Sequence, residues 1–82
     1  MKYYRLYIQD DEGKTLIHLF NEVAGEHPLA QARRVIKGFY RGHPNWVMPE
    51  FKKLGEDRWR LNGTHRHPLF MATEGVWYVE AD

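Results

Sequence analysis

The sequence predicts an α+β fold in which one helix packs across a face of an antiparallel sheet. Two observations lead to this prediction. Residues 27–42 show the only convincing helical period, and the segments on both sides show the alternation and turn signals of short strands. The expected order is ββα followed by three or four short strands, in a single domain spanning residues 1–82.

The helix is predicted from apolar residues at three- and four-residue spacing. These residues share one face and are Leu29, Ala32, Val35, Ile36 and Phe39. Pro28 suits the first turn, where its missing N–H is not needed. Gly42 is expected to end the helix in a left-handed conformation, and Pro44 bars the helix from resuming. We expect the apolar face to bury Leu29, Ala32, Ile36 and Phe39 against the sheet.

Two strands are predicted before the helix. Residues 2–9 alternate, with Tyr4, Leu6 and Ile8 on one side. Residues 14–23 are apolar on both faces over LIHLF, which favours a position inside the sheet. A turn ending at Gly13 joins the two strands into an antiparallel hairpin.

Shorter strands are predicted after the helix, separated by turn residues. They comprise residues 51–54, 58–61, 69–72 and 76–79. Pro49 either confines the first of these to a sheet edge or marks a bulge before it. Trp59 and Leu61 are expected to face inward, and residues 64–68 are expected to form a polar loop.

Composition restricts the possible functions. Twelve Lys and Arg residues against eleven Asp and Glu give a net charge of +1, which argues against an acidic nucleic-acid mimic and against a strongly basic coating protein. The absence of cysteine excludes disulfide scaffolds and thiolate metal sites. No apolar run approaches the roughly 18 residues of a membrane span, and no signal peptide is evident. A soluble, cytoplasmic protein is therefore expected.

A basic face on the predicted helix is the first candidate binding surface. Its residues are Arg33, Arg34, Lys37 and Arg41. No Asp or Glu occurs between Pro28 and Asn45, so pairing within the helix cannot neutralise them. Arginine suits planar contacts to phosphate or carboxylate groups. The face is either solvated surface or a contact to nucleic acid or to an acidic protein groove.

The outward side of the first strand is the second candidate. It carries Tyr3, Arg5 and Tyr7, provided that the helix covers the Leu6 side. Tyr and Arg frequently anchor interfaces, and exposed aromatic rings can stack single-stranded bases. Ordinary cross-strand pairing is the alternative interpretation. The sequence lacks the aromatic, glycine-rich signature of an RNA recognition motif.

Catalytic and metal-binding patterns are missing from the sequence. His65 and His67 lie on one side of an extended backbone and could join His18, His27 or His43, but no carboxylate or cysteine completes a set. A phosphate-cradling glycine loop, a GxSxG turn and an HExxH motif are also absent. We therefore expect a non-enzymatic protein without a metal or cofactor.

The segments KYYRLYI, LAQARRVIKGFY and GVWYVE span most of the chain. Their order in a small, cysteine-free domain resembles the phage-encoded inhibitors called anti-CRISPR proteins. We expect a binding module that docks on a larger protein or ribonucleoprotein complex through the basic helix face. The resemblance implies a stoichiometric inhibitor that works in a host cytoplasm, docks on a CRISPR-type ribonucleoprotein and blocks DNA binding or cleavage, with the basic face near the nucleic-acid path or in contact with DNA. The main alternative is a small nucleic-acid-binding regulator, and the third is an accessory subunit of a bacterial complex.

Overall fold

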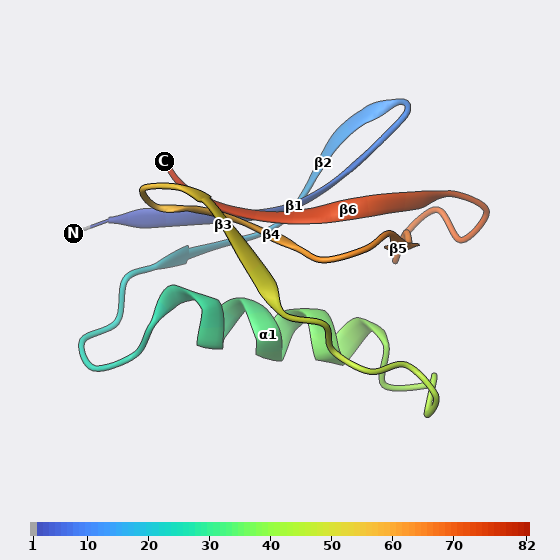
Figure 1. The fold of residues 1–82 in the computed structure, drawn as a ribbon, viewed down its shortest axis with the longest axis horizontal. Helices are drawn as coiled ribbons and strands as arrows, with labels where there is room; N and C mark the ends of the chain where they lie inside the picture. The colour runs from blue at the N-terminus through green and yellow to red at the C-terminus, as the bar shows by residue number, and fades with distance from the viewer. Residues whose placement is uncertain (1) are drawn as a thin grey trace.

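A computed structural model describes residues 2–82 and confirms the predicted α+β fold (Figure 1). Its elements are β1 (Tyr3–Asp10), β2 (Gly13–Asn21), α1 (Pro28–Phe39), β3 (Phe51–Gly55), β4 (Arg58–Leu61), β5 (His65–Arg66) and β6 (Glu74–Ala81). The helix covers one face of the sheet and leaves the other face open (Figure 1). No helix within residues 2–82 is long and apolar enough to cross a membrane.

The sheet is antiparallel and places the C-terminal strand in its middle. The strand order is β2-β1-β6-β4-β3, and the short β5 pairs with the beginning of β6. The β1–β2 hairpin is closed by Gly13, whose φ of +128° is available to glycine but strained for other residues. β6 therefore joins the β1–β2 hairpin to the β3–β4 hairpin.

The core lies between α1 and the covered face of the sheet. Alternate residues of three neighbouring strands point toward the helix because successive side chains of a strand face opposite sides. The buried side chains of these strands are Tyr4, Leu6, Ile8, Trp59, Leu61, Trp77 and Val79. Ala32 and Ile36 meet them from the helix. The predicted inward positions of Trp59 and Leu61 are confirmed.

The helix is shorter than predicted at its C-terminal end. His27 caps its start, with the Nδ1 atom accepting a hydrogen bond from the Leu29 N–H at 3.1 Å. The helix ends at Phe39, and Gly42 does not adopt the expected positive φ. The prediction that Phe39 is buried is wrong, because this residue is 40% exposed. Tyr40, just beyond the helix, enters the core instead.

Two strand predictions are also corrected. β2 is an edge strand and does not lie inside the sheet, so its apolar residues on the open face remain exposed. The pairing register shifts between Leu6 and Tyr7, and Ile17 has no partner in it. Residues 69–72 form a loop in place of the predicted strand, whereas part of the predicted polar loop forms β5.

Candidate binding surfaces

Two of the four cations in the predicted basic face of the helix, Arg33 and Arg34, have partners within the molecule. Arg34 makes two hydrogen bonds to the Glu26 carboxylate, at 2.6 and 3.1 Å, and this pairing lowers the pKa of Glu26. The Arg33 guanidinium lies 5.3 Å from the centre of the Phe51 ring. The sequence argument considered acidic residues inside the helix alone. Glu26 lies before the helix, so this partner of Arg34 was not predicted.

Lys37 and Arg41 are the remaining cations of this predicted surface. Both are exposed, and neither forms an ion pair or a side-chain hydrogen bond within residues 2–82. Arg41 follows the end of the helix and does not continue its face. The structure therefore does not bring the four predicted residues together as one stripe of free charge.

The open face of the sheet carries Tyr3, Arg5 and Tyr7, as predicted. Tyr3 is 48% exposed, and Arg5 pairs with the Asp82 carboxylate. Tyr7 is only 3% exposed, although it belongs to the uncovered face. Its ring is covered by neighbouring side chains of the same face, as described next.

Four side chains from four neighbouring strands form a stack across the open face, here called the outer stack. The Lys14 amine lies 5.0 Å from the centre of the Tyr7 ring. Tyr7 stacks on Tyr78 with ring centres 5.3 Å apart, and the Arg58 guanidinium lies 5.2 Å from the centre of the Tyr78 ring. Both aromatic rings are thus occupied by partners within the molecule.

Exposed apolar side chains and unpaired donors lie beside the outer stack. Leu16 and Leu19 are 56% and 51% exposed on β2, opposite Tyr7 and Arg5. The Tyr7 hydroxyl and the Arg60 Nε atom are buried without a hydrogen-bond partner among residues 2–82. The nearby Tyr7 hydroxyl raises the pKa of Arg58, although the two groups do not meet the geometric criteria of a hydrogen bond.

The positive charges of the open face are only partly neutralised. The strand register places five cations there, Arg5, Lys14, Lys52, Arg58 and Arg60. Glu80 and Asp82 pair with Arg58 and Arg5. No ion pair within residues 2–82 involves the other three cations.

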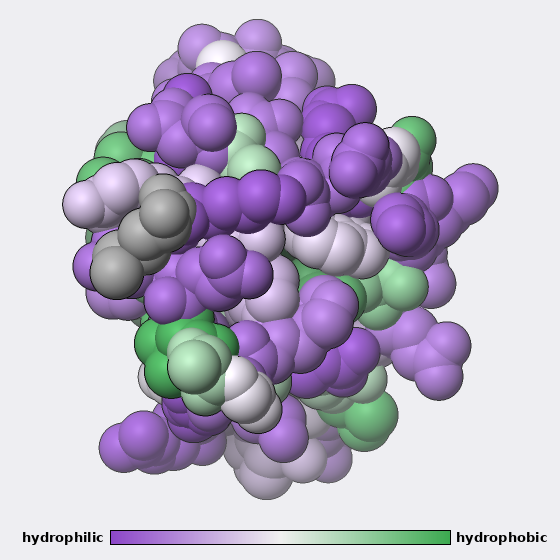
Figure 2. Space-filling model, turned by 90° about the vertical axis from the view of Figure 1, so that its left-hand side faces the viewer, coloured by the Kyte–Doolittle hydropathy of each residue, from purple (hydrophilic) through white to green (hydrophobic). Residues whose placement is uncertain are grey.

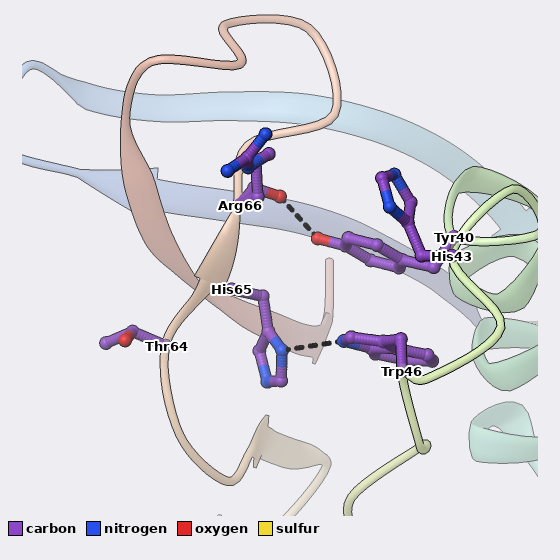
Figure 3. Close-up of a pocket in the computed structure, with 6 residues that line it drawn as sticks. All are labelled: Tyr40, His43, Trp46, Thr64, His65 and Arg66. Atoms are coloured by element: carbon purple, nitrogen blue, oxygen red, sulfur yellow. Dashed lines mark hydrogen bonds between the residues drawn. The ribbon is translucent and has the colours of Figure 1, made fainter.

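A cleft of about 300 Å³ lies where the end of α1 meets β5 (Figure 3). Its lining residues are Tyr40, His43, Trp46, Thr64, His65 and Arg66. The rings of Tyr40 and Trp46 stack with their centres 4.4 Å apart. The Trp46 indole N–H donates to His65 Nδ1 at 3.2 Å, and this contact fixes the two segments against each other.

Tyr40 connects the cleft to the core. Its hydroxyl donates to the Arg66 carbonyl oxygen at 2.5 Å and accepts a hydrogen bond from the Trp77 indole N–H at 3.2 Å. Burial raises the pKa of Tyr40 because the charged phenolate would lose its hydration. The Tyr40 hydroxyl is therefore a structural group that holds β5 against the helix end.

The loop before β6 presents three consecutive large apolar side chains, Leu69, Phe70 and Met71, all about half exposed. The buried His67 holds this loop, since its Nδ1 atom accepts hydrogen bonds from the N–H groups of Leu69 and Phe70, each at 3.1 Å.

The opposite end of the molecule, where both termini lie, is mostly hydrophilic with small separate apolar areas (Figure 2).

His43 and His65 both line the cleft, but the other histidines lie outside its lining. His65 faces Trp46, while His67 is buried against its own loop. Within residues 2–82, no three His, Cys, Asp or Glu side chains are placed to hold a metal ion.

Sequence reasoning missed the cleft and the apolar loop. Each of the two segments that form the cleft has an unusual local sequence, an aromatic residue near Pro44 in one and the His65-Arg66-His67 run in the other. Nothing in the sequence indicates that these two segments meet.

Comparisons of the chain with protein-family models, with curated proteins and with solved structures found no match.

Proposed function

We propose that the chain is a non-enzymatic binding module that docks on a protein partner through the open face of its sheet. The observation that carries the proposal is the exposure of Leu16, Leu19 and Tyr3 on a face that no other layer covers. Exposed apolar side chains beside polar ones are typical of interaction sites. The fitting partner presents an apolar surface bordered by carboxylates.

The charges of this face support an acidic partner. Lys14 and Arg60 have no carboxylate partner among the described residues. Complementary charges across an interface steer association and set its specificity. Carboxylates of a docked protein would pair with these two cations.

The outer stack favours protein over single-stranded nucleic acid. Nucleobases bind sheets by stacking on free aromatic faces. Tyr7 lies between Lys14 and Tyr78, and Arg58 covers Tyr78, so these rings offer little free surface. Among the aromatic residues predicted on the open face, Tyr3 is exposed whereas Tyr7 is not.

The resemblance to anti-CRISPR proteins supplies the narrower form of the proposal. In that form the chain is a stoichiometric inhibitor in a host cytoplasm, and its partner is a CRISPR-type ribonucleoprotein. A regulator that binds nucleic acid through Tyr3 and the cations of the open face is the second candidate.

The test places a photo-crosslinking residue at Leu19 and, as a matched control, at Val47. Val47 is 78% exposed in the segment between α1 and β3, away from the open face. Crosslinking in the source cells identifies the attached protein, which is then purified. Leu16→Asp with Leu19→Asp should abolish its binding, whereas Val47→Asp should leave a complex of fixed stoichiometry.

Crosslinks from position 47 alone, or full binding by the Leu16→Asp, Leu19→Asp protein, would overturn the proposed surface. Turnover of many partner molecules per copy would instead indicate an enzyme. Tight, salt-sensitive binding to a single-stranded oligonucleotide, without a protein partner, would favour the regulator.

A further inference from the structure

The aromatic side chains of the cleft are fixed by hydrogen bonds and by the stacking of Tyr40 on Trp46, so the two rings cover each other and only the outer side of the pair borders the cleft. Since the indole N–H can only donate, His65 Nδ1 must accept, and His65 Nε2 then donates to the Asn62 carbonyl oxygen at 3.0 Å. The Tyr40 hydroxyl is likewise used by Arg66 and Trp77. These groups shape the walls of the cleft and have no polar atom left for a ligand.

Two polar side chains of the lining are free. The His43 imidazole and the Arg66 guanidinium make no hydrogen bond or ion pair within residues 2–82, and both are exposed. In Figure 3 both project on the same side of the Tyr40 ring. No Asp or Glu lines the cleft. The fixed charge of Arg66 therefore makes this aromatic cleft cationic.

Glu74 is the nearest competitor for Arg66. The two residues are directly opposite in the β5–β6 register, but the Glu74 carboxylate accepts a hydrogen bond from Thr64 at 3.3 Å and forms no ion pair with Arg66. The guanidinium thus remains available, and a ligand anion would compete with Glu74 for it.

We propose that the cleft binds an aromatic anion, a flat ring carrying a carboxylate or a phosphate. The ring would lie against the Tyr40 and Trp46 side of the cleft, and the anion would meet Arg66 with His43 beside it. Guanidinium groups bind both kinds of oxyanion through paired N–H donors. A volume of about 300 Å³ suits a ligand of one or two rings. This site does not depend on the proposed protein docking.

The test is a titration with phenyl phosphate and with benzoate, followed by the NMR signals of the Trp46 indole N–H and the Arg66 backbone amide. We expect both signals to shift with saturation below about 10 mM, a weak affinity suited to so small and open a site. Inorganic phosphate and benzyl alcohol each lack one half of the ligand and should bind at least about tenfold more weakly. The stronger of the two aromatic anions identifies the preferred oxyanion.

Matched variants assign the binding to this cleft. Arg66→Gln should weaken phenyl phosphate at least about tenfold, whereas Lys53→Gln, which removes an exposed cation outside the lining, should change nothing. Glu74→Gln should strengthen binding by removing the competitor. Absence of shifts with both aromatic anions, equal binding of benzyl alcohol, or an unaffected Arg66→Gln protein would each overturn the proposal.

Discussion

Replacing Gly75 by alanine should destabilise the protein, whereas replacing Gly38 by alanine should stabilise it. A Cβ atom on Gly75 would lie 2.7 Å from the backbone oxygen of Gln9 and 2.8 Å from Cγ1 of the buried Ile8. The oxygen belongs to β1 and cannot rotate away, so the strands must move apart. Overpacking of this kind costs about 1–3 kcal/mol, which lowers the Tm of a domain this small by roughly 4–24 °C.

Gly38 provides the opposite case. It lies exposed in α1, and a Cβ there meets nothing within 4 Å. Alanine should therefore add about 0.5–1 kcal/mol by its higher helix propensity and raise the Tm by roughly 2–8 °C. Thermal and urea unfolding followed by circular dichroism measure both variants. If the Gly75→Ala protein is as stable as the wild type, the start of β6 does not pack closely against Gln9 and Ile8 of β1, and the reasoning is refuted.

Two further predictions concern the core. Ile36→Ala should lower the free energy of unfolding by about 2–5 kcal/mol because Ile36 is fully buried, and an unchanged urea midpoint would refute the observed orientation of α1. Burial raises the pKa of Tyr40 above its ordinary value of 10.0, so above that pH the unfolded chain releases a proton that the folded protein retains. Stability should accordingly fall as the pH rises beyond 10.0, and the fall should be smaller in Tyr40→Phe; an identical pH profile in the two proteins would contradict this role of Tyr40.

The helix and the inward-facing strand residues could be predicted because their signals are local. The spacing of Ala32 and Ile36 and the alternation of Leu6 and Ile8 each define one buried face without knowledge of the rest of the chain. β2 was misplaced because apolar residues on both faces are typical of a central strand. In this protein Leu16 and Leu19 are apolar yet exposed, so their pattern does not reflect burial in the monomer.

The candidate sites depend on side-chain contacts that periodicity does not specify. Residues 69–72 have strand composition, but the buried His67 accepts the backbone N–H groups of Leu69 and Phe70 and holds this segment in a loop. Glu26 neutralises Arg34 from the segment before the helix. Trp46 meets His65 of β5, and this contact depends on where the sheet places β5.

The central position of β6 bears on how the chain folds as it is made. The β1–β2 and β3–β4 hairpins can form early, but isolated hairpins are marginal in water. In the sheet they are joined through Glu74–Ala81, whose contacts pair opposite ends of the chain, as between Tyr4 and Ala81. Such nonlocal pairing slows folding and favours an all-or-none transition. A nascent chain stalled before Glu74 therefore holds two unjoined hairpins whose apolar faces are open to chaperones and to aggregation.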